Sequence, residues 1–210
     1  MPATTTARIT IAAIAASVLT ACAGTPAPAP SPASSPASGP ASGSESTSGA
    51  AATEVNPAGD IPDNQAYVPF TPPGAGFTVK IPEGWASSAS GATTTFTDKL
   101  NQVQVTSSHA AAAPTTASVT TSDVPALKTQ TPNFAVGQAS TVSRAAGQAV
   151  LLTYQGDSAP NPVTGKVVRD AFERYSFFRA GIRVDLTLSG PTNADNVDPW
   201  RTVTDSLRWS

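Results

Sequence analysis

Apolar and polar residues alternate in short stretches from position 76 onward, which is the period of a strand with one buried face. In residues 76–85, Phe77, Val79 and Ile81 fall on one side of the predicted strand, and Pro82 ends it. Residues 93–107 predict two strands around a polar connection at 98–101. Further strands are predicted over residues 134–144 and 149–156.

The clearest hairpin joins residues 167–178 to residues 182–190 through Arg179, Ala180 and Gly181. In its second strand the alternation predicts a buried side and a side that faces water. The buried side holds Ile182, Val184, Leu186 and Leu188, and the solvent-facing side holds Arg183 and Asp185. The first strand carries large apolar residues on both sides, which a bulge or burial of both faces would explain.

A helix is predicted at the C-terminal end of the sequence. Asp198 is expected to cap it and Pro199 to occupy its first position. Trp200, Val203 and Leu207 then share one apolar stripe.

A second helix is possible over residues 115–130, although Pro125 would break or kink it. The elements together predict the α+β class. We expect a central antiparallel sheet of about six or seven strands, flanked by helices that include the C-terminal one.

The first residues predict an export signal and a lipid anchor. Residues 9–20 carry no charge, match the hydrophobic region of a signal peptide in length, and are too short to span a bilayer. The sequence Leu19-Thr20-Ala21-Cys22 resembles the bacterial lipobox. The resemblance implies removal of residues 1–21 and a diacylglyceryl group on Cys22, whose two acyl chains anchor durably. The alternative is a plain signal peptide with an unmodified cysteine.

Composition divides the remaining chain into a tether and one domain. Residues 23–60 are almost entirely Ala, Gly, Pro, Ser and Thr, and such a segment cannot bury enough apolar surface to fold. All thirteen aromatic residues lie at or after Tyr67. We therefore expect a disordered tether up to residue 60 and a single globular domain over residues 61–210.

The charge of the predicted domain argues against nucleic acid as a partner. Residues 61–210 contain eleven Lys and Arg and eleven Asp and Glu, so this part has no net charge. Proteins that bind nucleic acid usually show a basic excess. The predicted location is the outer face of the cytoplasmic membrane, with the membrane contacted through the lipid on Cys22.

Three stretches are similar to a known group of proteins: "FTVKIPEGW", "FTDKLNQVQV" and "DPWRTVTDSLRW". Together they resemble small actinobacterial lipoproteins with a PsbP-like domain, the group that includes the LpqN and LpqT lipoproteins. The resemblance implies a central antiparallel sheet flanked by helices. It also implies an accessory or binding role, with no catalytic residues to carry over.

The sequence predicts no catalytic, cofactor-binding or metal-binding residues. His109 is the single histidine and lies where a strand runs into a loop, so a solvated side chain is expected. No G-x-S-x-G turn and no phosphate-binding loop occur in the sequence. For Trp85 and Trp200 packing in the core is favoured over a carbohydrate platform, whereas Trp209 could be exposed.

Charged residues of the central hairpin form the predicted surface for a protein partner: Arg169, Glu173, Arg183 and Asp185. Pairing of these charges across strands is the competing interpretation. The leading functional hypothesis is a non-catalytic accessory or binding module of the cell envelope, with an unidentified envelope protein as its partner. The alternatives are a small solute-binding lipoprotein that serves a transporter, with a pocket between helix and sheet, and an envelope hydrolase.

Overall fold

The structure is a computed structural model that describes residues 57–161 and 163–210. The predicted signal peptide, Cys22 and the tether up to residue 56 lie outside the described residues. Within the described part, no helix is long and apolar enough to cross a membrane.

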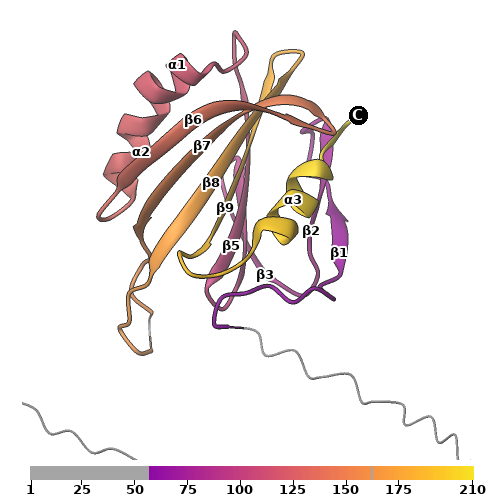
Figure 1. Cartoon of the computed structure of the whole chain (residues 1–210). Helices are drawn as coiled ribbons and strands as arrows, with labels where there is room; N and C mark the ends of the chain where they lie inside the picture. Colours follow the sequence, from indigo (N-terminus) through magenta and orange to yellow (C-terminus); the bar gives the residue numbers. More distant parts are fainter. Residues whose placement is uncertain (1–56, 162) are drawn as a thin grey trace, which may run out of the picture. The chain divides into compact units, whose positions relative to one another are not determined.

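Seven antiparallel strands form the large sheet, in the order β3-β4-β5-β9-β8-β7-β6 (Figure 1). Its strands are β3 (Ala86–Ser90), β4 (Thr93–Asp98), β5 (Asn101–His109), β6 (Ala135–Arg144), β7 (Gly147–Asp157), β8 (Arg169–Arg179) and β9 (Ile182–Pro191). Every strand predicted from residue 93 onward is present.

The central hairpin turns on two residues with positive φ, Ala180 at 50° and Gly181 at 82°. Two such residues in sequence suit the tight turn that matches the twist of an antiparallel pair. The pairing of β8 with β9 continues without a break from Arg179↔Ile182 to Asp170↔Pro191. A bulge is therefore not the reason for the apolar residues on both sides of β8.

Both faces of the large sheet are covered, and this explains the pattern of β8. On the face that we call the inner face, Tyr175, Phe177 and Leu186 belong to the main core. On the opposite, outer face, Val150, Leu152 and Tyr154 of β7 form a second, smaller core. Tyr154 stacks on Phe172 there, with ring centroids 4.6 Å apart.

The inner face is closed by a small sheet and a helix. The small sheet has the order β1-β2-β10 and consists of β1 (Tyr67–Phe70), β2 (Phe77–Pro82) and β10 (Arg208–Trp209). The helix is α3 (Val197–Asp205). The buried side predicted for β2 is confirmed, but β2 lies in this second sheet, and a single sheet was expected.

Helix α3 presents its predicted apolar stripe to the core, since Trp200, Val203 and Leu207 are all buried. The predicted cap is wrong, because the N-cap position is held by Asn196, and Asp198 lies in the first turn. The Asn196 side chain accepts from the Ile61 amide and donates to the Gly59 carbonyl oxygen. It therefore joins the start of the domain to α3.

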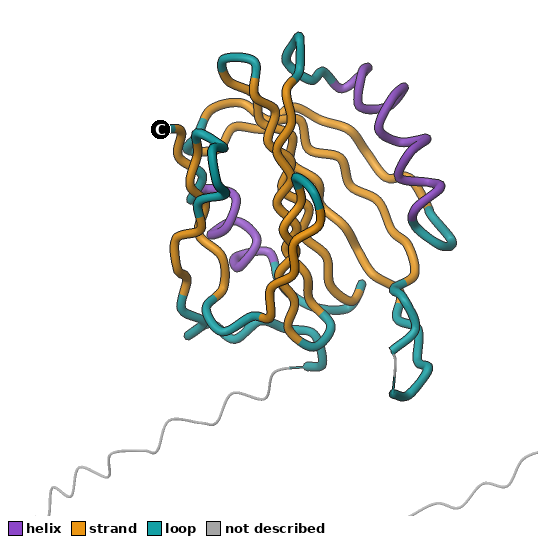
Figure 2. The backbone as a smooth tube through the Cα atoms, turned by 180° about the vertical axis from the view of Figure 1, so that it is seen from behind, coloured by secondary structure: helices purple, strands orange, loops and turns teal. Residues whose placement is uncertain are grey.

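The outer face is covered by one continuous helical segment, made of α1 (Thr116–Ser118), η1 (Val119–Asp123) and α2 (Val124–Gln130). Figure 2 shows this segment along the end of the large sheet that is farther from α3. Pro125 does not break it. The chain takes a π-helical turn over η1, immediately before the proline, and Pro125 falls in the first turn of α2, where a missing N–H is tolerated.

Candidate functional site

The candidate site is a cleft on the inner face, between α3 and strands β6, β7 and β8, which extend beyond α3 in Figure 1. Its volume is about 310 Å³. The lining residues come from four elements: Ala135, Val136 and Gly137 of β6, Thr153, Tyr154 and Gln155 of β7, Ala171, Phe172 and Glu173 of β8, and Trp200 of α3.

The cleft exists because the residue types on the inner face change along the strands. Where β8 passes beneath the core its inner side chains are Tyr175 and Phe177, both buried. Farther along the strand the same face carries Ala171 and Glu173, and neither is fully covered. The first turn of α3 contributes Trp200 as a wall, so the smaller residues beyond it leave an open space.

A bulge in β6 shapes one side of the cleft. The register of β6 against β7 shifts between Val136 and Ala139. At this point the Gln138 amide donates to Thr153 Oγ1 at 3.0 Å. A Cβ atom on Gly137 would lie 2.5 Å from the same oxygen, so only glycine allows this close approach.

A chain of polar contacts ends at Glu173 in the cleft. The Tyr175 hydroxyl donates to Glu173 Oε2 at 2.6 Å and accepts from Arg144 Nη2 at 2.9 Å. Arg144 Nε donates to Thr204 Oγ1 of α3 at 3.0 Å and lies 3.9 Å from Asp205 Oδ1. Burial raises the pKa of Tyr175, and its hydrogen bond to Glu173 raises it further, so the phenol stays neutral and donating.

Trp200 carries an unsatisfied donor at the cleft. The side chain is only 9% exposed, and its Nε1 has no hydrogen-bond partner among the described residues. Buried polar groups are nearly always paired, so this covered indole N–H is an exception that lowers the stability of the fold. The prediction that Trp200 packs in the core is confirmed, and its second role in the cleft was not foreseen.

The other two tryptophans pack against the main core. Trp85 is partly buried, and Trp209 lies edge-on to Phe77 with ring centroids 6.3 Å apart. Trp209 Nε1 also donates to the Ala146 carbonyl oxygen at 3.2 Å. The possibility that Trp209 is fully exposed is therefore wrong.

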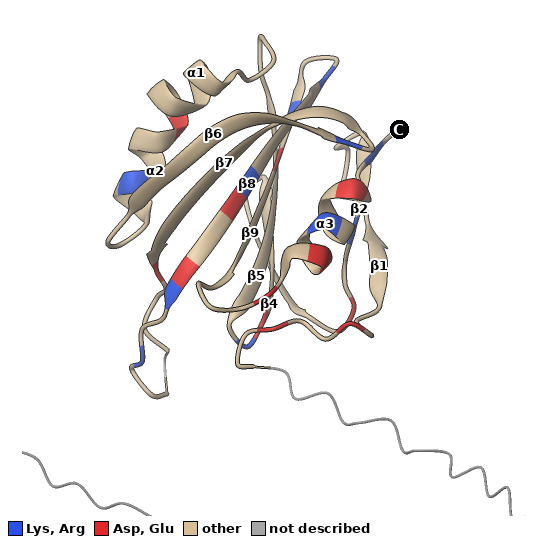
Figure 3. Cartoon of the chain, viewed as in Figure 1, with Lys and Arg blue, Asp and Glu red and all other residues tan. Residues whose placement is uncertain are grey.

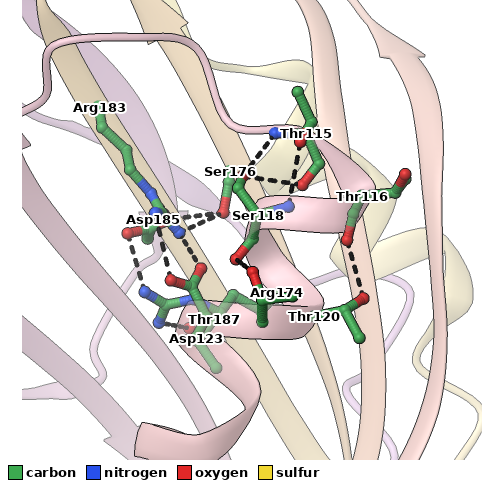
Figure 4. A network of polar contacts seen from close by, with 11 residues as sticks. Thr115, Thr116, Ser118, Thr120, Asp123, Arg174, Ser176, Arg183, Asp185 and Thr187 are labelled. Carbon is green, nitrogen blue, oxygen red and sulfur yellow. Dashed lines mark hydrogen bonds and ion pairs between the residues drawn. The ribbon is translucent and has the colours of Figure 1, made fainter.

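The predicted partner residues do not lie together. Arg169 pairs with Asp157 across β7 and β8 at 3.1 Å, whereas Glu173 is in the cleft. Arg183 and Asp185 belong to the outer face, where the helical segment covers them (Figure 4). Asp185 is only 4% exposed, so the prediction that it faces water is wrong.

The outer-face charges form a buried network around Asp185. Its carboxylate accepts from Arg174 Nη2 at 2.8 Å, from Arg183 Nε at 3.0 Å and from the Ser176 hydroxyl at 2.5 Å. Arg183 also forms an ion pair with Asp123 of η1. These contacts fasten the helical segment to the sheet, so cross-strand pairing describes Arg183 and Asp185 better than a free surface does.

The remaining candidates offer little chemistry. His109 is exposed at the end of β5, and the described residues contain no group of three His, Cys, Asp or Glu side chains that could hold a metal ion. A hollow of about 400 Å³ is lined by the single segment Lys128–Phe134 and no other element. Lys and Arg are interspersed with Asp and Glu over the domain, as Figure 3 shows.

No protein-family model matches this sequence, and no curated protein matches it significantly. Solved structures similar to the chain include cyanobacterial PsbP from Synechocystis sp. PCC 6803, with 15% identity, a TM-score of 0.49, and coverage of 70% of this chain and 94% of that one. LpqN of Mycobacterium tuberculosis, involved in cell envelope biogenesis, has 13% identity and a TM-score of 0.42. The match covers 69% of this chain and 91% of LpqN. A protein of Bacteroides thetaiotaomicron has 14% identity and a TM-score of 0.46 over 68% of this chain, which spans 48% of that protein. At these identities none of the three assigns an activity or a ligand to the cleft.

Proposed function

We propose that this chain is a membrane-anchored, extracytoplasmic binding module of the cell envelope, and that the cleft between α3 and β6–β8 is its ligand site. The observation that carries the proposal is the cleft itself, which is lined by the indole-bearing Trp200 and by Glu173, the one charged residue among its lining residues. Convergent polar groups in a largely apolar cleft are typical of binding sites.

The anchoring part of the proposal rests on the resemblance of residues 19–22 to a lipobox. A lipid on Cys22 would hold the chain at the outer face of the membrane, and the Pro- and Ser-rich residues after it would give the domain reach. An accessory role accords with the resemblance of three stretches of the sequence to lipoproteins with a PsbP-like domain.

Binding is favoured over catalysis because Glu173, the one carboxylate in the cleft, has no partner suited to acid–base chemistry among the lining residues. Glu173 is already hydrogen-bonded to the neutral Tyr175 hydroxyl, and no lining residue is a histidine, a cysteine or a second carboxylate. General acid–base chemistry usually requires two groups of matched pKa at the reacting atoms. A hydrolase acting on envelope polymers therefore ranks below a binding module.

The size of the cleft favours a small molecule over a large protein surface as the occupant. A volume of about 310 Å³ lies at the lower end of the range for small-molecule sites. A small solute-binding lipoprotein that serves a transporter is consequently the second candidate. An envelope protein that inserts one side chain into the cleft would fit the same volume.

A thermal-shift screen of the full chain in detergent tests the site. Compounds that bind should raise the melting temperature of the wild type by several degrees, because they stabilise only the folded state. Ala171→Phe fills the cleft and should abolish these shifts. Ala86→Phe, at an exposed position of β3, is the matched control and should retain them. Equal shifts in both variants would contradict the proposed site.

A further inference from the structure

The cleft carries one unbalanced charge. Among its ten lining residues, Glu173 is the only charged one. Nearby Arg144 lies 3.9 Å from Asp205, which also pairs with Arg201, and Arg144 is linked to Glu173 only through the Tyr175 hydroxyl. None of the ion pairs within residues 57–161 and 163–210 includes Glu173. Glu173 thus has no direct ion pair among these residues.

The carboxylate is also held in place. Tyr175 fixes Glu173 Oε2 through the 2.6 Å hydrogen bond, and the phenol is itself fixed by Arg144, whose guanidinium lies 4.9 Å above the Tyr175 ring. Glu173 Oε1 takes no part in this chain of contacts. A carboxylate oriented beforehand binds a cation with less loss of side-chain freedom than a mobile one.

The other lining residues of the cleft suit an organic cation. The indole of Trp200 attracts ammonium and guanidinium groups through its ring face. Ala135, Gly137 and Ala171 add apolar surface for an aliphatic arm. The negative charge of Glu173 attracts a cation and disfavours an anion.

We propose that the cleft recognises its ligand through an organic cation, a primary ammonium or guanidinium on an aliphatic arm, with Glu173 as counter-ion and Trp200 as the aromatic wall. This inference rests on the proposed function and names the ligand class of that site.

Two sources share this chemistry: a free amine and a lysine or arginine side chain of a polypeptide. Strand β6 bears on the choice, because it is the outermost strand of the large sheet and, among the described residues, pairs only with β7. Its outer edge has backbone groups available to an extended peptide, and its residues Ala135–Gly137 line the cleft. A peptide could therefore pair with β6 while it places a basic side chain beside Glu173.

The experiment is a titration of the full chain in detergent, followed by two-dimensional NMR of the Trp200 indole N–H and the Gly137 amide. Three probes of equal length separate charge from shape: pentylammonium, 1-pentanol and pentanoate. We expect pentylammonium to move both signals in a saturable way and the other two to act at least tenfold more weakly. A capped Ala-Lys-Ala peptide, compared with its norleucine analogue, distinguishes the sources, since tighter binding than pentylammonium indicates a polypeptide ligand and equal or weaker binding a free amine.

Glu173→Gln keeps an acceptor for Tyr175 but removes the charge, and it should weaken pentylammonium binding about tenfold or more. Glu83→Gln is the matched control, because Glu83 is exposed and lies outside the cleft. Should Glu173→Gln fail to fold, the salt dependence of the wild type decides, since affinity for a charged probe falls as ionic strength rises.

The outcomes separate this inference from the function on which it rests. Equal binding of 1-pentanol and pentylammonium, or full affinity in Glu173→Gln, would overturn the cation and leave the cleft as a ligand site. Absence of any probe-induced shift at Trp200 and Gly137, together with a failed thermal-shift screen, would overturn both.

Discussion

Two buried aspartates of the central hairpin differ in their partners, and this difference sets their energetic roles. Asp185 accepts three hydrogen bonds, two of them from guanidinium groups. Asp170 is only 7% exposed, and its Oδ1 has no partner in the described part of the chain. The first should stabilise the fold as an anion, whereas the second should oppose folding when it is ionised.

Replacing Asp185 tests the buried network. Asp185→Ala leaves Arg174 and Arg183 without their shared counter-ion, so we expect a loss of about 3–5 kcal/mol in the free energy of unfolding, measured with urea. Asp98→Ala removes an aspartate whose only ion pair is the exposed contact to Lys99, and it should cost less than about 1 kcal/mol. Similar losses in the two variants would show that the network does not stabilise the domain.

Replacing Asp170 tests whether an ionised aspartate at this position opposes folding. Burial raises the pKa of Asp170 from 3.8 to about 6, and the charge of Asp157 adds to this rise. The folded state therefore holds the proton more tightly, and the wild type should lose stability as pH rises from about 4 to about 6. Asp170→Asn should flatten this decline and be more stable at pH 7 by about 3 kcal/mol.

Urea unfolding at pH 3.5, 5 and 7 measures the effect of Asp170→Asn, with Asp63→Asn at an exposed position as its control. A decline that persists unchanged in Asp170→Asn would assign the pH dependence to other groups.

Single residues were the hardest part of the site to predict. The sequence shows Trp200 in an apolar stripe, which predicts a core residue, and Glu173 in a strand, which predicts a charged surface residue. Whether Trp200 also borders a cavity depends on the small residues Gly137 and Ala171, which are distant in the sequence. The separation of Glu173 from Arg183 follows from strand alternation, but the covering of Arg183 by the helical segment does not.

At the scale of elements, the helical segment over the outer face depends on a small number of local contacts. Thr115 accepts from the Ser118 amide, and the Ser118 hydroxyl accepts from the Thr115 amide, which completes a capping box. Val119 is the only residue of α1 and η1 that is buried, and the ion pair from Asp123 to Arg183 adds a polar link. A segment with so few links should open locally more easily than the sheet beneath it.

Thr115→Ala tests the importance of the cap. We expect a loss of about 1 kcal/mol, seen as faster amide hydrogen exchange over residues 116–130 with little change in β8 and β9. Thr121→Ala is the control, because the Thr121 hydroxyl bonds only to carbonyl oxygens of its own helical segment. Unaltered exchange in Thr115→Ala would mean that packing alone holds the segment.

Prediction of the elements failed for strands that are very short or carry no apolar residues in alternation. Strand β3 has the sequence ASSAS and is exposed along its whole length, so it carries no alternation to detect. Strand β10 has only two residues, and its pairing with β2 depends on the position of α3. The helical segment could be suggested but not bounded, because the effect of Pro125 depends on the π-helical turn before it.

At the scale of the whole molecule, the alternation predicted an antiparallel sheet with helices but not its layers. Two covered faces require two cores, and the apolar residues on both sides of β8 were the signal for this. The second sheet could not be predicted, since β1 and β10 are separated by more than a hundred residues and meet only through β2.

The lipid anchor is a prediction for the whole chain. Cys22→Ser removes the acceptor of the diacylglyceryl group, so the chain should move from the membrane fraction to the soluble fraction, because the two acyl chains supply the affinity. Phase partition in detergent and mass spectrometry of the mature N-terminus measure the change. Ser31→Ala is the control and should remain with the membrane. Retention of Cys22→Ser in the membrane would refute the anchor.

The pairing of β10 with β2 has a consequence for how the protein is made. Residues 208 and 209 supply an edge of the small sheet, and the Trp209 ring rests on Phe77, so the core stays incomplete until these residues leave the ribosome. The domain can therefore complete its fold only after residue 209 has been synthesised. A chain cut before residue 208 would leave one edge of β2 unpaired and Phe77 without its aromatic neighbour, and its product should be prone to degradation.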